Sequence, residues 1–444
     1  MSTVSTGEAP RPEPPARPEP LYVKLHPGPN ALDHDAVASN QRSRLIGAMI
    51  EEVAERGYAA TTLARLVALA GVSKRAFHEL FQTKEAYFLA TYDAIVANAV
   101  RRIGAAYRSD GDWQARLRAG FTAYAAEVVE EPKAARLVLV EVLGAGPAAL
   151  ARMRRTRLIF EEVLSTSFRE APDGVMLPPL IAKAIVCGVE RITRQQLLAG
   201  DVEELPALTD ELLAWSLSYC SPAAAGIVAA SPTRCDVHTP CCPRASDESD
   251  WPRILRCAAE IAATKGFAQL SPARIASDAG VSTERFDELF ESGEQCFLDA
   301  LDRLRLEAVV CATQAAQRTR GLAAVYAGIA ALMRHIATNP VLVQVAFIEI
   351  SALGTTGIER RDRLLGQFTD QLLRGLPESR APSRLAAEAS VGAVWGIVHY
   401  HVMLGATHLL PGLADYATYI ALAPVIGGEA AVQVILAARK SPDP

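Results

Sequence analysis

The chain has 444 residues, of which 50% are hydrophobic and 21% charged, a composition typical of folded globular proteins and not of disordered chains. This length predicts more than one domain. With 45 basic and 50 acidic residues the formal net charge is -5, which excludes a uniformly basic nucleic-acid-binding surface but allows a local basic patch.

Residues 1–40 contain eight of the 27 prolines, and we expect them to form a disordered or extended arm. The first 20 residues lack the apolar core of a secretory signal. No apolar run reaches the roughly 18 residues of a membrane helix, so no membrane partner is expected. Eight cysteines without a secretory signal indicate reduced thiols and a cytoplasmic location.

Residues 41–93 read as three short helices and the start of a fourth. Apolar residues recur every three or four positions in the first helix, at Leu45, Ile46, Met49, Ile50 and Val53. Gly57 ends that helix, Thr62 caps the second, and Gly71 ends it. The pattern over residues 61–81 is that of a helix-turn-helix, although such corners also occur in helical proteins that bind no DNA.

Positive charge gathers at the start of the third helix, where Ser73 caps the chain and Lys74 and Arg75 follow. Cations at a helix N-terminus oppose its dipole, so stability alone would favour acids there. A DNA phosphate against that end reverses the preference. Other basic residues placed for phosphate contacts are Lys84, Arg42 and Arg44.

A second copy of this pattern follows a linker. Residues 94–220 predict a helical regulatory domain and residues 221–250 a Pro-punctuated linker. Residues 42–93 then align without a gap on 251–302, with 19 of 52 positions identical. Residues 303–438 complete the second copy as another helical domain. The fold class predicted is therefore all-α, with two tandem repeats that each combine a helix-turn-helix domain with a helical ligand-binding or dimerisation domain.

The string ATTLARLVALAGVSKRAFHELFQTKEAYF (60–88) resembles the DNA-binding domain of the tetracycline-repressor (TetR) family, and SPARIASDAGVSTERFDELFESGEQCF (271–297) resembles it again. The resemblance implies three DNA-binding helices followed by a helical domain with a small-molecule pocket and a dimer-forming helix pair. It implies a ligand-responsive repressor that binds double-stranded operator DNA. By motif position the DNA contacts implied are Thr62, Ser73, Lys74, Arg75, His78 and Lys84, with His78 at a position where Tyr is common. The matching second set is Ser271, Ser282, Thr283 and Arg285.

The two helix-turn-helix segments, here the first reader (41–93) and the second reader (251–302), differ in charge. Residues 42–90 carry a net charge of +2, whereas residues 251–299 carry -3. Glu284 and Asp287 replace Arg75 and His78. We therefore predict that the first reader binds DNA while the second serves as its structural partner. The alternative is that both read DNA, since an acid can accept a hydrogen bond from cytosine.

Each copy ends in a pair of apolar helices that we expect to form a dimer-like interface, either within one chain as a pseudo-dimer or between chains in a homodimer. These pairs are residues 179–199 with 206–219 and residues 384–405 with 412–437. Candidate pocket residues for an unknown small-molecule effector are Trp113, Tyr124, Glu190, Tyr326, Trp395, His399 and His401. For each of them a role in the core or the interface is the simpler interpretation.

No other chemistry is expected. The linker contains Cys235, His238, Cys241 and Cys242, a group that could bind zinc or sense oxidants, but an ordinary linker is favoured and no metal is predicted. The chain lacks the common nucleophile, phosphate-loop, dinucleotide and zinc-protease motifs, so neither an enzyme nor a cofactor is expected. The alternative function is a helical small-molecule-binding or scaffold protein that has lost DNA binding.

Overall fold

The computed structural model describes residues 34–171, 177, 180–221, 249–376 and 382–440. These residues form helices joined by turns and contain no strand. The all-α class predicted from the sequence is confirmed for this part of the chain.

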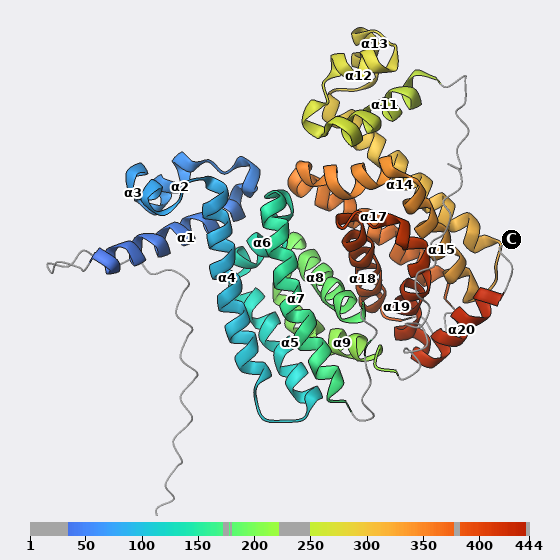
Figure 1. Ribbon diagram of the computed structural model, residues 1–444, viewed down its shortest axis with the longest axis horizontal. Coiled ribbons are helices and arrows are strands. Elements are labelled where there is room, and N and C mark those ends of the chain that lie inside the picture. Colours follow the sequence, from blue (N-terminus) through green and yellow to red (C-terminus); the bar gives the residue numbers. More distant parts are fainter. Residues whose placement is uncertain (1–33, 172–176, 178–179, 222–248, 377–381, 441–444) are drawn as a thin grey trace, which may run out of the picture.

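We call residues 34–221 the first half and residues 249–440 the second half. The first half contains α1 (His34–Ala60), α2 (Leu63–Ala70), α3 (Lys74–Leu80), α4 (Lys84–Tyr107), α5 (Trp113–Glu130), α6 (Pro132–Leu139), η1 (Glu141–Gly144), α7 (Pro147–Arg169), α8 (Ile181–Ala199), η2 (Val202–Glu204) and α9 (Leu205–Leu217). Figure 1 shows α1–α3 at one edge of this half and the longer helices below them.

The second half follows the same order of elements. It contains α11 (Asp250–Lys265), η4 (Phe267–Gln269), α12 (Pro272–Ala279), α13 (Thr283–Leu289), α14 (Gly293–Gln317), α15 (Ala323–Thr338), α16 (Pro340–Val343), η5 (Gln344–Ile348), η6 (Glu349–Leu353), α17 (Gly354–Arg374), α18 (Arg384–Met403), η8 (Thr407–Leu413), α19 (Ala414–Ile426) and α20 (Gly428–Lys440). In Figure 1 the group α11–α13 stands apart from α1–α3.

Local signals in the sequence account for most helix starts. Thr83 and Asp112 cap α4 and α5, accepting hydrogen bonds from Ala86 N and Ala115 N at 3.0 and 2.8 Å. Prolines occupy the first turn of α6 and α7, where the missing N–H is not needed. One boundary differs from the sequence prediction, because α1 already begins at His34, inside the segment 1–40 expected to be an arm.

Two hydrophobic cores divide the molecule. One lies within the first half beneath α1–α6, and Ile358 of α17 joins it from the second half. The other joins α8 and α9 to the whole second half. One apolar core thus extends across the boundary between the two halves.

The seam between the halves is formed mainly by α8 against α18, the most extensively packed helix pair in the described chain (Figure 1). Their close approach depends on glycine, because a Cβ on Gly188 would lie 2.8 Å from the Ala389 carbonyl oxygen. Polar bonds also cross the seam: Trp215 donates to Ser390 Oγ at 3.0 Å, and Tyr219 donates to the Ile420 carbonyl at 3.0 Å. The two closing helix pairs predicted from the sequence therefore meet within one chain.

Two described segments, 340–374 and 407–426, are apolar and long enough to cross a membrane by length and composition. This differs from the sequence expectation that no such run exists. Helices buried in a protein interior pass the same test, and 67% of the apolar window in 407–426 is buried inside the structure. The first segment is also broken into short helical turns at 344–353.

Candidate nucleic-acid interface and cavity

The turn between α2 and α3 has a fixed geometry. Gly71 adopts the left-handed conformation (φ 62°, ψ 37°), which a residue with a side chain rarely takes. The Val72 N–H donates to the Val67 carbonyl at 3.1 Å, closing α2. Ser73 is extended, and its Oγ accepts a hydrogen bond from Ala76 N at 3.1 Å, starting α3. The direction of α3 is thereby set by local bonds.

Aromatic side chains hold α3 on the rest of the first reader. Phe77 is fully buried and makes an edge contact with Tyr87 of α4, with ring centroids 5.4 Å apart. Phe81 stacks on the same Tyr87 at 4.9 Å. Since α3 is only seven residues long and could not persist alone, this packing keeps its outer face rigid.

The outer face of α3 carries exposed cations. Lys74 is exposed, the Arg75 side chain is 91% exposed, and the first turn holds no acidic residue. Arg75 pairs with Glu79 at 3.1 Å, an exposed pair that contributes little and can be exchanged for a phosphate. His78 is also exposed one turn further on, with its ring edge against Phe77. The three residues are available to an external anion.

The other residues predicted to contact DNA are placed differently. The ammonium of Lys84 donates to the carbonyls of Tyr58 (3.1 Å) and Thr61 (2.9 Å), and burial lowers its pKa. Arg44 donates to the Gly71 carbonyl at 2.9 Å, and thus braces the turn. The side chain of Thr62 makes no capping bond, and both Thr62 and Arg42 are exposed.

The second reader repeats this geometry with a different charge. Gly280 is left-handed (φ 67°, ψ 35°), and Ser282 Oγ accepts from Arg285 N at 3.1 Å. Ser271 caps α12 by accepting from Arg274 N at 3.4 Å, and Thr283 is exposed.

The electrostatics of α13 oppose phosphate binding. Glu284 lies in its first turn, where a backbone N–H and the Ser282 hydroxyl lower the pKa of its carboxyl. The guanidinium of Arg285 donates to Asp250 at 2.9 Å and to Glu288 at 2.7 Å. The one cation at this position is therefore already paired with two carboxylates, which no sequence pattern revealed.

Each reader is tied to the helices below it by a buried or half-buried glutamate. Glu141 Oε2 accepts a hydrogen bond from Tyr58 N at 3.0 Å, directly after Gly57 (φ 77°). In the second half Glu349 Oε2 accepts from Phe267 N at 2.8 Å, directly after a glycine of similar conformation. The partners of these glutamates lie 83 and 82 residues away in the chain, so no local sequence pattern indicates these bonds.

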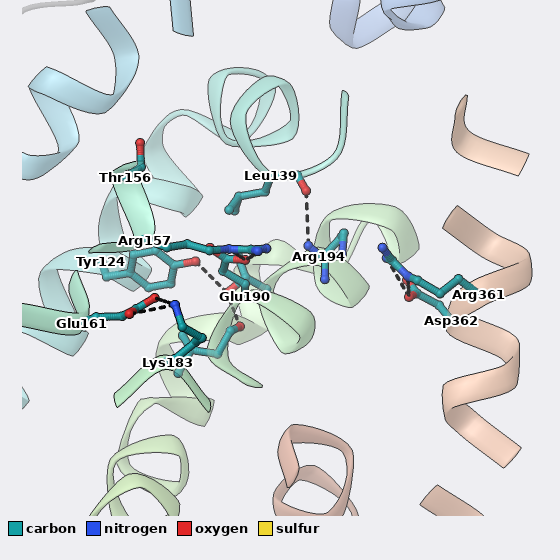
Figure 2. Close-up of polar contacts among 12 residues, drawn as sticks. Tyr124, Leu139, Thr156, Arg157, Glu161, Lys183, Glu190, Arg194, Arg361 and Asp362 are labelled. Atoms are coloured by element: carbon teal, nitrogen blue, oxygen red, sulfur yellow. Dashed lines mark hydrogen bonds and ion pairs between the residues drawn. The ribbon is translucent and has the colours of Figure 1, made fainter. Parts of the chain in front are cut away.

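A cavity of about 170 Å³ lies in the first half and is lined by residues of α4–α8. Tyr124 and Glu190, both predicted from the sequence, line it, whereas Trp113 packs against Phe168 outside it. Its walls are mainly aliphatic and aromatic. Two of the polar groups among them already have partners: the hydroxyl of Tyr124 donates to Thr193 Oγ1 at 3.0 Å, and Glu190 accepts from Arg157 Nε at 2.9 Å (Figure 2). Glu131 also lines the cavity, and burial raises the pKa of its carboxyl.

The predicted pocket residues of the second half do not share one cavity. Trp395 and His399 line a smaller cavity of about 30 Å³ between the halves, and Trp395 stacks on Phe347 at 4.3 Å. Tyr326 lies elsewhere, and burial and the neighbouring Asp415 raise its pKa to about 12. His401 is buried, with Nδ1 2.8 Å from a carbonyl oxygen of its own helix.

No group of three or more His, Cys, Asp or Glu side chains among the described residues is arranged to hold a metal ion. The linker group of Cys235, His238, Cys241 and Cys242 lies outside the described residues.

A basic cluster at the seam was not predicted from the sequence. The spacing of Arg191 and Arg194, three residues apart, places them on one helix face and is the signal that could have indicated it. The cluster consists of Arg157, Arg191, Arg194 and Arg361.

Part of the sequence is similar to a known protein family. Residues 45–91 match the model of bacterial regulatory proteins of the tetR family. No curated protein matches the chain. A TetR-like transcriptional regulator from Rhodococcus sp. RHA1 matches at 17% identity and a TM-score of 0.36, covering 42% of this chain and 99% of its own.

The transcriptional regulator FadR from Bacillus subtilis, solved in complex with stearoyl-CoA, matches at 15% identity and a TM-score of 0.35, covering 40% of this chain and 97% of its own. Residues 45–91, within the first reader, are therefore similar to the bacterial regulatory proteins of the tetR family, as the sequence resemblance predicted for this segment.

Proposed function

We propose that this protein is a transcription regulator that binds operator DNA through α3 of the first reader. The observation that carries the proposal is the exposed pair Lys74 and Arg75 at the start of a rigidly held helix, with no acid in that turn. Backbone N–H groups and cations there converge on one side, which suits a phosphate backbone. The second reader has Glu284 and a doubly paired Arg285 at the same place.

The two halves act in this proposal as a tandem pseudo-dimer in which only one reader engages DNA. The α8–α18 seam brings together within one chain the helices that would otherwise pair between subunits. A single engaged reader predicts an asymmetric operator with one contacted half-site.

Selection of bound genomic DNA followed by footprinting tests this proposal. We expect one protected half-site per chain and an affinity that falls steeply with salt. Two equivalent half-sites contacted by a monomer would show that both readers bind. The absence of salt-dependent binding to any genomic fragment would favour the alternative, a helical ligand-binding protein without DNA affinity.

In our proposal the effector of this regulator is an apolar small molecule that binds in the cavity lined by α4–α8. Binding of this molecule causes the protein to release DNA, and repression is thereby relieved. Apolar cavities of about 150 Å³ stay dry and accept ligands of the size of benzene, and the cavity here is slightly larger. Because Tyr124 and Glu190 already have polar partners, Glu131 is the polar group left in the wall to which a ligand could form a hydrogen bond.

Binding of benzene, measured by isothermal titration calorimetry, provides a test of this cavity. Val138 lines the cavity, and Val138→Trp should fill it and reduce benzene binding at least tenfold. Leu158→Trp is the matched control, since Leu158 is 57% exposed on α7. Equal benzene binding by both variants would place the site elsewhere.

A further inference from the structure

Two glutamates line the large cavity of the first half at its α5–α6 junction. Glu127 lies in the last turn of α5, and Glu131 directly follows this helix. Glu127 accepts a hydrogen bond from Asn98 Nδ2 at 3.1 Å and forms an ion pair with Arg102. The half-buried carboxyl of Glu131, by contrast, forms no hydrogen bond or ion pair with any described residue.

The cations near Glu131 already have carboxylate partners. Arg102 pairs with Glu130 as well as with the other glutamate of the cavity wall. Lys133 pairs with Glu51 of α1. Burial raises the pKa of the Glu131 carboxyl, and neighbouring carboxylates raise it further. The carboxylate of Glu131 is thus partly removed from water in a region with excess negative charge, and an added cation would stabilise it.

Glu131 occupies a helix-capping position without capping the helix. It precedes Pro132 at the start of α6, but its side chain forms no capping hydrogen bond with a described N–H group. In the second half the residue before the matching proline is Asn339, and its side chain accepts from Leu342 N at 2.9 Å, as N-cap residues commonly do. The second copy therefore uses this position for structure, whereas in the first copy the carboxyl remains available to a ligand.

The space beside this carboxyl is a property of the first half. Ile103 and Tyr107 of α4 line the cavity, and the alignment of the two copies places Ala312 and Ala316 at these positions in α14. The small side chains allow α15 to pack closely on α14: a Cβ on Gly328 would lie 3.1 Å from the Ala312 carbonyl oxygen and 3.5 Å from Ala316 Cβ. We therefore expect one ligand per chain, bound in the first half.

We propose that the effector bound in this cavity is a small apolar amine, with its ammonium group against Glu131 and its apolar body among the aliphatic and aromatic walls. This assignment rests on the proposed effector cavity and names the class of ligand that it takes. Hydrogen bonds between an ammonium and a carboxylate are roughly twice as strong as those between neutral groups. The cavity volume of about 170 Å³ is close to the roughly 150 Å³ that accepts benzene, so the apolar body is about one six-membered ring.

The test compares three ligands of similar shape, toluene, benzylamine and benzoate, by isothermal titration calorimetry on the full chain at neutral pH. We expect one benzylamine per chain, bound at least tenfold more tightly than toluene, and benzoate bound more weakly than toluene. Glu131→Gln keeps the size of the side chain but removes its charge, so this variant should lose the preference for benzylamine and bind toluene as before. Glu162→Gln, at a glutamate whose side chain is 74% exposed on α7, is the matched control and should keep the preference.

The outcomes separate the class of ligand from the cavity itself. Because the Glu131 side chain has no partner among the described residues, Glu131→Gln should leave Tm unchanged, and a loss of benzylamine binding then reflects the lost charge. Equal affinities for benzylamine and toluene, or a preference for benzylamine that survives Glu131→Gln, would overturn the assignment of an amine while leaving the cavity in place. Toluene binding that Val138→Trp does not reduce would refute the cavity and the amine together.

Discussion

Removal of the two cations at the start of α3 gives the sharpest test of the DNA interface. The change is Lys74→Gln with Arg75→Gln. Both side chains are exposed and bury no apolar surface, so the fold should not depend on them. Loss of cations from a helix N-terminus should even stabilise α3 slightly, by about 0.3–1 kcal/mol each at low ionic strength. The exposed pair with Glu79 accounts for only a few tenths of a kcal/mol in the other direction.

The effect on DNA binding should be large by comparison. Each phosphate contact releases about 0.9 counterion, so loss of two contacts should reduce the slope of log K against log salt by about 1.8. At 0.1 M salt this corresponds to an affinity lower by about 60-fold. Fluorescence anisotropy on a fragment recovered by genomic selection, measured between 0.05 and 0.3 M salt, gives both numbers.

The matched control is Arg285→Gln in the second reader, where the cation is already neutralised by Asp250 and Glu288. We expect no change in slope for this variant. An equal loss of slope from both readers would refute the asymmetry. An unchanged slope after the double substitution in α3 would refute the assignment of Lys74 and Arg75 as phosphate contacts.

Three further predictions follow from buried contacts. Glu141→Ala and Glu349→Ala each leave a backbone N–H unpaired, so each should lower the free energy of unfolding by about 1–3 kcal/mol. Only Glu141→Ala should also weaken DNA binding, because it acts on the first reader. Equal losses of DNA binding would contradict the difference proposed between the two readers. Gly396→Val forces a side chain against α8 at the seam, so the free energy of unfolding measured in urea should fall by about 1–3 kcal/mol. An unchanged midpoint of urea unfolding would show that the stability of the protein does not depend on this contact between the halves. The pKa of His399 is about 3 in the folded protein, below its unfolded value of about 6.5, so the unfolded state takes up a proton first as the pH falls. The free energy of unfolding should therefore decrease below about pH 6.5, by about 2 kcal/mol at pH 5. His399→Gln should remove this part of the decrease, whereas His408→Gln, at an exposed histidine, should not.

The sequence predicted the elements that depend on neighbours within about four residues. Apolar spacing gave the helices, while Gly71 and Ser73 gave the turn and cap that the structure shows. The contrast in charge between the readers was also visible, since it needs only the alignment of residues 42–93 with 251–302. The start of α1 was misjudged, because prolines earlier in the segment suggested an extended arm as far as residue 40.

The candidate site was predicted less completely. Lys84 and Arg44 are cations of the right kind in the motif, but their nitrogens are bonded to backbone carbonyls 23–27 residues away. A side chain's availability depends on such partners, and composition does not reveal them. In the same way Trp395 and His399 read as pocket candidates and lie instead at the seam between the halves.

By itself the sequence determined the helical class, the two copies of the pattern and the surface on which cations gather, because propensity, capping and charge are local properties. Only the tertiary structure decided which cations are free and which carboxylates already have partners. Arg191 and the Glu388 carbonyl are separated by 197 residues and meet only because α8 packs on α18. Such contacts depend on the packing of whole helices, for which a single sequence contains no local signal.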